Sequence, residues 1–201
     1  MSLVVLTGGA RSGKSSVAQG LAEQCKQPVT VVVFGGTDDD AEMLARVERH
    51  RAERPSHWIT VEATDSAEWV RRVGDGPLMI DCLGTLLGRV MEEVYAEYSG
   101  RALNDATELP SEFESEVERR FAALVGWVLR RFDQTIVVTN EVGDGLVPAY
   151  PSGRVFRDVL GRANRSLVER ADLSYLVVAG RCIELSSLSR GAKWPKPQAC
   201  E

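Results

Sequence analysis

Short apolar runs alternate along the chain with longer runs in which apolar residues recur at helical spacing. The runs interpreted as strands are residues 3–7 (LVVLT), 29–34 (VTVVVF), 58–62 (WITVE), 77–81 (PLMID), 135–139 (TIVVT) and 173–179 (LSYLVVA). The helical patterns begin at about Lys14, run through Arg46 and His50, begin at Leu83, span 111–131 and follow Ser152. Strands that are apolar on both faces and alternate with helices predict an α/β fold, with a mostly parallel central sheet and helices on both faces.

The two ends of the chain differ from this regular alternation. Residues 182–185 (CIEL) predict an antiparallel edge strand, whereas proline, glycine and lysine interrupt any period in residues 189–201. With 201 residues, of which 44% are hydrophobic, the chain has enough apolar material for one domain with a core. We therefore expect a single catalytic domain over 1–185 and a flexible tail over 186–201.

Composition narrows the classes of partner and compartment. A net charge of −5 argues against a nucleic-acid partner, which requires a basic surface. The apolar runs are too short for a membrane span, and no cleavable leader pattern precedes them, so we expect a cytoplasmic protein. The cysteines lie far apart without a CxxC pair, which predicts neither a zinc site nor a disulfide framework.

The chemistry-bearing motif is GGARSGKS at residues 8–15, which matches the P-loop pattern GxxxxGK[ST] between an apolar strand and a helix. Its glycines allow backbone amides to face phosphate oxygens at a helix N-terminus. Lys14 is expected to reach the β- and γ-phosphates, and the Ser15 hydroxyl to hold Mg²⁺. The fold expected is that of a P-loop NTPase, RecA-like. The predicted nucleotide-binding residues of the loop are Gly8, Gly9, Ala10, Arg11, Ser12, Gly13, Lys14 and Ser15.

Polar residues at two other strand ends are further candidates. Asp81 ends the run PLMID, where an acid supports Mg²⁺ in P-loop proteins, although it is also a suitable cap for the following helix. Asn140 and Glu141 follow the run TIVVT, and ligands of open α/β sheets bind at the carboxyl ends of strands. Turn chemistry beside Gly143 explains these two residues equally well.

The only two histidines, His50 and His57, lie in one arginine-rich segment, RVERHRAERPSHW. On a helix, His50 falls on a stripe with Arg46 and Arg54 at intervals of four residues. Neighbouring guanidinium groups disfavour the imidazolium form and attract a polyphosphate, so a neutral ring there is able to attack phosphorus. A histidine on a charged helix is also often simply solvated. His57 is interpreted as structural.

These motifs together resemble one family in their order along the chain. The blocks TGGARSGKS, ARVERHRAERPSHW, DCLGTLL, VTNEVGDGLVP and FRDVLGRANR are similar to those of the bifunctional adenosylcobinamide kinase and adenosylcobinamide-phosphate guanylyltransferases of cobalamin biosynthesis. The resemblance covers nearly the whole chain apart from the tail. Two departures are Arg165, where the family commonly has glutamine, and FGGTDDD after the second strand.

The resemblance implies a bifunctional kinase and nucleotidyltransferase with Mg²⁺, ATP and GTP. Such an enzyme phosphorylates adenosylcobinamide and then transfers GMP from GTP to the phosphate through a guanylyl-histidine, here His50, releasing pyrophosphate. A covalent guanylyl-histidine divides the transfer of GMP into two displacements at phosphorus. The resemblance further implies a homo-oligomer, a trimer in the family. The residues that it adds to the GTP site are Gly35, Gly36, Thr37, Arg51, Ala52, Glu53, Arg54, Glu62 and Asp81.

Two other functions fit the P-loop. A kinase of another small metabolite needs no covalent histidine, and a nucleotide-dependent switch needs no transfer chemistry. Glu62 likewise has two interpretations, as an acceptor for guanine or ribose donors or as an exposed strand-end carboxylate.

Overall fold

The computed structural model describes residues 2–34, 54–100, 102–103 and 108–191. Its strands are β1 (Ser2–Thr7), β2 (Thr30–Val33), β3 (Ile59–Glu62), β4 (Leu78–Asp81), β5 (Gln134–Val138), β6 (Leu173–Val178) and β7 (Arg181–Glu184). Its helices are α1 (Lys14–Ala22), α3 (Trp69–Arg72), α4 (Leu83–Ser99), α5 (Phe113–Leu129) and α6 (Pro151–Arg170).

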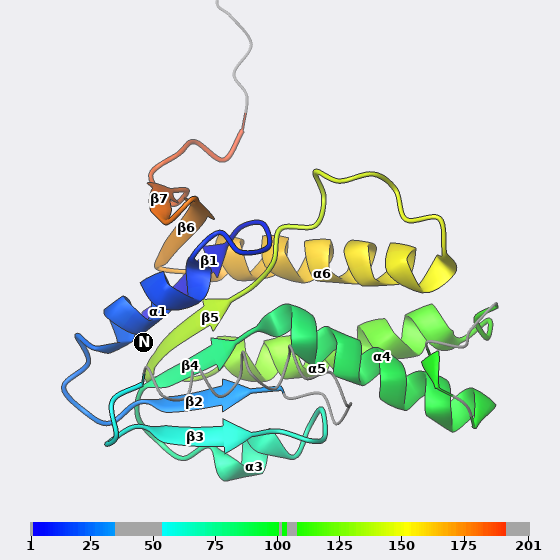
Figure 1. Cartoon of the computed structure of the whole chain (residues 1–201), viewed down its shortest axis with the longest axis horizontal. Helices are drawn as coiled ribbons and strands as arrows, with labels where there is room; N and C mark the ends of the chain where they lie inside the picture. The colour runs from blue at the N-terminus through cyan, green and yellow to red at the C-terminus, as the bar shows by residue number, and fades with distance from the viewer. Residues whose placement is uncertain (1, 35–53, 101, 104–107, 192–201) are drawn as a thin grey trace, which may run out of the picture.

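A single sheet joins all the strands of the described chain, in the order β3-β2-β4-β5-β1-β6-β7 (Figure 1). Strands β1 to β6 pair in parallel, and β7 pairs antiparallel with β6. This confirms the α/β fold, the mostly parallel sheet and the antiparallel edge strand expected from residues 182–185. Because β1 lies between β5 and β6, the loop that follows β1 emerges near the middle of the carboxyl edge.

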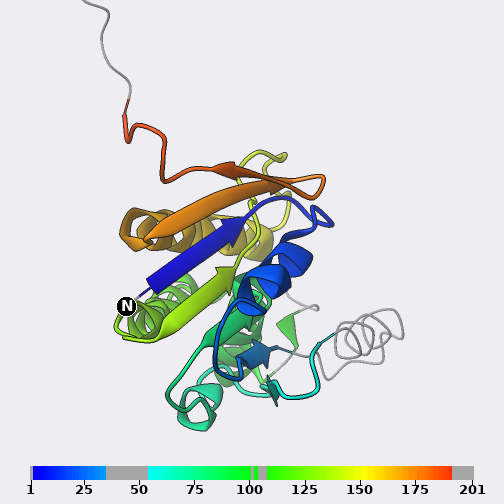
Figure 2. The same ribbon diagram turned by 90° about the vertical axis from the view of Figure 1, so that its left-hand side faces the viewer.

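The period-2 alternation within each strand divides the sheet into two buried faces. Leu3 and Val5 of β1 belong to one apolar cluster, which includes α3, α4, α5 and α6. Leu6, from the same strand, belongs to a second cluster with Ala18 and Ala22 of α1. Figure 2 shows α1 on one side of the sheet and α4, α5 and α6 on the other. Helices therefore cover both faces, as expected from strands without a polar face.

Helices α4 and α5 extend beyond the carboxyl ends of the strands (Figure 1). They pack through buried residues such as Tyr95 and Phe113, whose rings meet edge to face at 6.1 Å between centroids. On their surface, Arg120 of α5 contacts Glu97 of α4 at 2.5 Å and Glu116 of its own helix at 2.6 Å. The start of α6 reaches the same region, so these helices form a projecting wall beside the carboxyl edge.

Some boundaries differ from those predicted. The short helix α3 was not expected, because four residues are too few to show a helical period. Helix α6 begins at Pro151, before the expected start, since proline is favoured in the first turn where its missing N–H has no helical partner. The predicted helix through Arg46 and His50, and residues 192–201 of the predicted tail, lie outside the described residues. None of the described helices combines the length and apolar character needed to span a bilayer.

Candidate active site

Two glycines give the loop after β1 its shape. Gly8 has φ 154°, and a Cβ there would lie 2.3 Å from the carbonyl oxygen of Val177 in β6. Gly13 has φ 93° and lies against Gly180, where a Cβ would meet the Gly180 Cα at 3.2 Å. The Gly180 amide also donates to the Ser12 carbonyl at 2.8 Å. The turn between β6 and β7 therefore holds one side of the loop, and side chains are excluded from both glycine positions.

Lys14 lies inside this loop and is buried. Its Nζ donates to the carbonyl oxygens of Gly8 at 3.0 Å and Gly9 at 2.7 Å, and contacts the Ser12 Oγ at 3.5 Å. An ammonium group has three donors and no acceptor, so phosphate oxygens would compete with these loop oxygens for the same protons. The geometry places a cation at the centre of the predicted phosphate site.

The N-terminus of α1 adds further donors beside Lys14. Its N-cap is Gly13, which supplies no side-chain hydrogen bond, and its first turn contains no acidic residue. The first amides of a helix lack carbonyl partners within the helix and carry partial positive charge. The start of α1 thus has the character of an anion site.

Ser15 and Asp81 come together next to the lysine. The Ser15 Oγ donates to Asp81 Oδ1 at 3.1 Å. Burial lowers the pKa of the Lys14 ammonium below its usual value. The nearby Cys82 and Asp81 partly offset this by raising the same pKa. The alternative role of Asp81 as a helix cap is wrong, because the N-cap of α4 is Cys82, in a capping box with Thr85. The Asp81 carboxylate is instead directed toward α1.

The end of β5 is connected to the P-loop through its backbone. The Glu141 amide donates to the Gly8 carbonyl at 2.9 Å. The Glu141 carboxylate accepts from the Gly143 amide at 2.6 Å, which is turn chemistry of the kind that the sequence also allowed. Asn140 lies close to the start of α4, since its Nδ2 would be 3.5 Å from a Cβ added at Gly84. Glu141 therefore supports the loop through a main-chain contact, whereas Asn140 lies toward α4.

The side chain of Asn164 in α6 binds the residues that follow β5. Its Oδ1 accepts from the buried Thr139 hydroxyl at 2.6 Å, and its Nδ2 donates to the Asn140 carbonyl at 2.9 Å. Asn164 is itself buried. It therefore links α6 to the strand end from which Glu141 reaches Gly8.

Replacing Asn164 by leucine is expected to lower the free energy of unfolding by about 2 kcal/mol, because the Thr139 hydroxyl and the Asn140 carbonyl lose their partners at a buried position. Urea denaturation of the purified chain measures this change. Gln24→Leu is the matched control, since the exposed Gln24 amide also donates to a carbonyl, that of Gly20. Equal midpoints for the two variants would contradict the role given to Asn164.

Glu62 and Arg54 lie far from the P-loop, at the β3 end of the sheet. Glu62 ends β3, four strands from β1, which at about 4.8 Å per strand corresponds to about 19 Å along the sheet. The Arg54 Nη1 contacts the Thr60 hydroxyl of β3 at 3.4 Å. The structure does not bring these two residues to the P-loop. The predicted residues Gly35, Gly36, Thr37, His50, Arg51, Ala52 and Glu53 lie outside the described part of the chain.

The comparison with known proteins assigns the chain to a family. Residues 4–185 match the family described as cobinamide kinase / cobinamide phosphate guanyltransferase. The chain belongs to this family. It is therefore a bifunctional enzyme, a kinase and a nucleotidyltransferase, with a P-loop fold.

Relatives in this family match over almost their full length. The bifunctional adenosylcobalamin biosynthesis protein CobU of Escherichia coli (strain K12) is 33% identical over 181 residues, which cover 89% of this chain and 96% of that protein. CobU of Salmonella typhimurium (strain LT2) is 32% identical with the same coverage of both chains. Among solved structures, an ATPase from the type III secretion system of pathogenic bacteria aligns with a TM-score of 0.50 and 14% identity, covering 87% of this chain and 50% of that one. This likeness shows the fold alone.

Two residues that support the P-loop of this family member were missed by sequence reasoning. Gly180 follows the last predicted parallel strand, and Asn164 lies in the block FRDVLGRANR as a polar residue on the buried side of α6. Their contacts join residues far apart in the sequence, which periodicity does not reveal. A buried asparagine in an amphipathic helix was the available signal, because buried amides are normally hydrogen-bonded.

Proposed function

We propose that the protein phosphorylates adenosylcobinamide with ATP or GTP, and then transfers GMP from GTP to adenosylcobinamide phosphate. The observation that carries this proposal is the family match across residues 4–185, together with bifunctional relatives aligned over nearly their full length. The arrangement of Lys14, Ser15 and Asp81 supports it, because phosphoryl transfer depends on alignment and charge neutralisation around the phosphates.

The two reactions use different phosphorus atoms. In the kinase reaction the substrate hydroxyl attacks the γ-phosphorus and the nucleoside diphosphate leaves. In the proposed transferase reaction a nitrogen of His50 attacks the α-phosphorus of GTP and pyrophosphate leaves. An oxygen of adenosylcobinamide phosphate then attacks the same phosphorus, which gives adenosylcobinamide-GDP and restores the imidazole. Lys14 and the first amides of α1 would bind the β- and γ-phosphates.

Ser15 and Asp81 fit the coordination chemistry of Mg²⁺. Both offer oxygen atoms, and these lie 3.1 Å apart beside the phosphate site. Mg²⁺ is usually held by one or two protein oxygens together with substrate phosphates and water. The described residues contain no group of three or more His, Cys, Asp or Glu side chains that could hold a metal ion. When bound, Mg²⁺ would neutralise phosphate charge.

The nucleotide is proposed to extend along the carboxyl edge of the sheet. The chain leaves β2 after Val33, three strands from β1, or about 14 Å at the usual strand spacing. The segment that follows carries Gly35 to Thr37 and His50 to Arg54, and β3 then ends at Glu62. We propose that these residues contact the guanosine and α-phosphate while the P-loop holds the outer phosphates. The resemblance also implies a homo-oligomer, a trimer by the family pattern, and this stays a prediction.

The test is whether nucleotide consumption depends on the corrinoid. The purified chain, with Mg²⁺ and GTP, is expected to form GDP only when adenosylcobinamide is added. Pyrophosphate beyond the single equivalent released by guanylylation of His50 is expected to depend on the corrinoid in the same way, and a chelator is expected to stop both reactions. Chromatographic separation of the nucleotides, with a parallel pyrophosphate assay, measures the two products. Consumption that does not respond to the corrinoid would favour a nucleotide-dependent switch or a kinase of another metabolite.

A further inference from the structure

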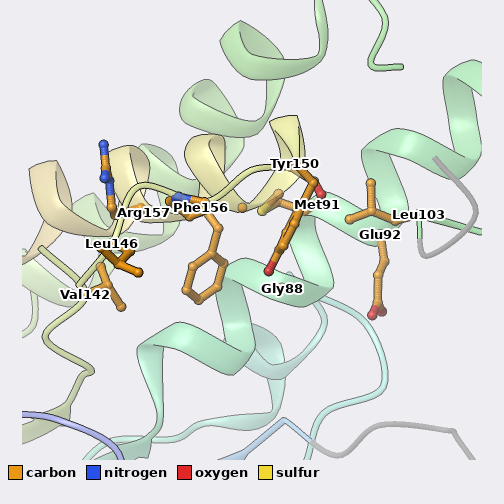
Figure 3. A pocket seen from close by; sticks show the side chains of 12 residues that line it. Gly88, Met91, Glu92, Leu103, Val142, Leu146, Tyr150, Phe156 and Arg157 are labelled. Carbon is orange, nitrogen blue, oxygen red and sulfur yellow. The ribbon is translucent and has the colours of Figure 1, made fainter. Parts of the chain in front are cut away.

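An apolar groove lies between α4 and the start of α6. It encloses a volume of about 350 Å³. Its wall on α4 is made by Gly88, Met91 and Glu92, and the opposite wall by residues of the 142–157 segment. Figure 3 shows Val142, Leu146 and Phe156 at one end of the groove, Leu103 and Glu92 at the other, and Met91 and Tyr150 between them. We refer to it as the α4–α6 groove.

Both chain segments that carry the walls of the groove begin next to residues that contact the P-loop. Helix α4 begins directly after Asp81, whose carboxylate contacts Ser15, and the 142–157 segment follows Glu141, whose amide contacts the Gly8 carbonyl. The ring of Phe156 lies at the start of α4, 3.6 Å from a Cβ added at Gly84. At about 1.5 Å per helical residue, the groove then extends from about 6 Å to about 12 Å beyond Gly84 along α4. The end of the groove at Phe156 is thus the end next to the start of α4.

The segment that carries Tyr150 is held by contacts within itself. The Arg154 guanidinium donates to the carbonyl oxygens of Pro148 at 3.0 Å and Ala149 at 2.8 Å. Gly153 allows the Tyr150 ring to pack closely, since a Cβ there would be 2.5 Å from the ring. A preformed apolar wall lowers the conformational cost of binding.

Large apolar side chains on this segment face solvent. Leu146 is 97% exposed, and Val147 and Tyr150 are 64% and 63% exposed. Clusters of exposed apolar side chains are typical of interaction sites and ligand-binding grooves. Charged groups stand at the rim: Glu92, which pairs with Arg89 at 3.2 Å, and Arg157, which pairs with Asp158 at 3.2 Å.

We propose that the α4–α6 groove binds an edge of the corrinoid macrocycle and directs its hydroxyl-bearing arm toward the P-loop. This inference rests on the proposed function. A corrinoid has methyl-bearing faces and a rim of amides, which match an apolar floor with a carboxylate and a guanidinium at the rim. It is too large to enter a cavity of about 350 Å³, so only one edge inserts and the rest lies over Leu146 and Tyr150. Because the groove lies beyond the start of α4, a substrate bound there would reach the P-loop only with a reactive group at the end of an arm.

The groove can be filled without changing its walls. Gly88 is half-buried in α4, and a Cβ there meets no atom within 4 Å. Gly88→Leu therefore places a side chain in the groove and also raises helix propensity. Gly161→Leu is the matched control, because Gly161 is an exposed glycine of α6, outside the groove, with equally open surroundings.

The experiment measures the dissociation constants of adenosylcobinamide and GTP, by equilibrium dialysis and calorimetry, for the full chain and both variants. Gly88→Leu is expected to weaken corrinoid binding by about tenfold or more, through lost apolar contact, and to leave GTP binding unchanged. Gly161→Leu is expected to match the wild type. As a second variant that does not touch the core, Leu146→Ser is expected to weaken corrinoid binding, whereas Leu188→Ser, at another exposed leucine, is not.

The outcomes separate this inference from the proposed function. If the wild type shows corrinoid-dependent turnover but Gly88→Leu and Leu146→Ser bind the corrinoid as tightly as their controls, the groove assignment is overturned and the function stands. If these two variants change only the mass of the particle in light scattering, the groove is a contact between copies, which also overturns it. If the wild type neither binds the corrinoid nor turns over GTP in its presence, both proposals fail.

Discussion

Replacing Lys14 by alanine is expected to abolish tight binding of GTP, with a loss of affinity of roughly 100- to 1000-fold. The Lys14 Nζ is the buried cation at the centre of the loop, and it already contacts the Gly8 and Gly9 carbonyl oxygens. Without it, the phosphates would face carbonyl oxygens that no longer have a neighbouring positive charge. Calorimetric titration with GTP measures the change, and both transfer reactions should decrease with it.

Lys26→Ala is the control for this substitution, because Lys26 is an exposed lysine beyond the end of α1. Urea denaturation of both variants shows whether the fold is retained, so that lost binding is not mistaken for unfolding. Unchanged GTP affinity in a folded Lys14→Ala protein would mean that residues 8–15 are not the nucleotide site.

Replacing His50 by alanine is expected to remove guanylyl transfer while leaving the kinase reaction largely intact. With GTP labelled at the α-phosphate, the wild-type chain should retain label that is acid-labile and base-stable, as a phosphoramidate is. His50→Ala should retain none, and formation of adenosylcobinamide-GDP should fall by at least about 1000-fold, since the attacking nucleophile is lost. Corrinoid-dependent formation of GDP should persist, because that reaction uses the γ-phosphorus.

The chain supplies a matched control for the histidine. His57 is the second of only two histidines, and it is exposed before β3. His57→Ala is expected to be labelled like the wild type. Label in His50→Ala, or its loss in His57→Ala, would assign the covalent step to another residue. An unlabelled wild type that binds GTP would favour a kinase without a covalent intermediate.

Local patterns predicted the part of the site that is local in sequence. Lys14 and Ser15 follow directly from the motif at residues 8–15, and the Lys14 start of α1 agrees with it. Asp81 could be placed at the same edge because parallel strands end there. The alternative role of Asp81 as a helix cap could be rejected only from the structure, since Cys82 and Thr85 give no strong sequence signal as a capping box.

The supports of the P-loop could not be predicted from sequence. Ser12 and Gly180 are joined by a backbone hydrogen bond, and Asn164 reaches across to β5 from α6. Such contacts depend on the order of strands in the sheet, which the alternation of apolar runs does not specify. The four-residue helix α3 was missed for a different reason, because a single turn is too short to establish a period.

The place of β1 in the sheet has a consequence for how the protein is made on the ribosome. β1 is the earliest strand of the described chain, yet its two neighbours are β5 and β6, at residues 134–138 and 173–178. The P-loop amides and Lys14 are therefore synthesised long before the residues that shape their surroundings, and Gly180 is added later still. During most of translation, this apolar strand is without its native hydrogen-bonding neighbours. Nucleotide can stabilise the nascent protein only after nearly the whole sheet has emerged.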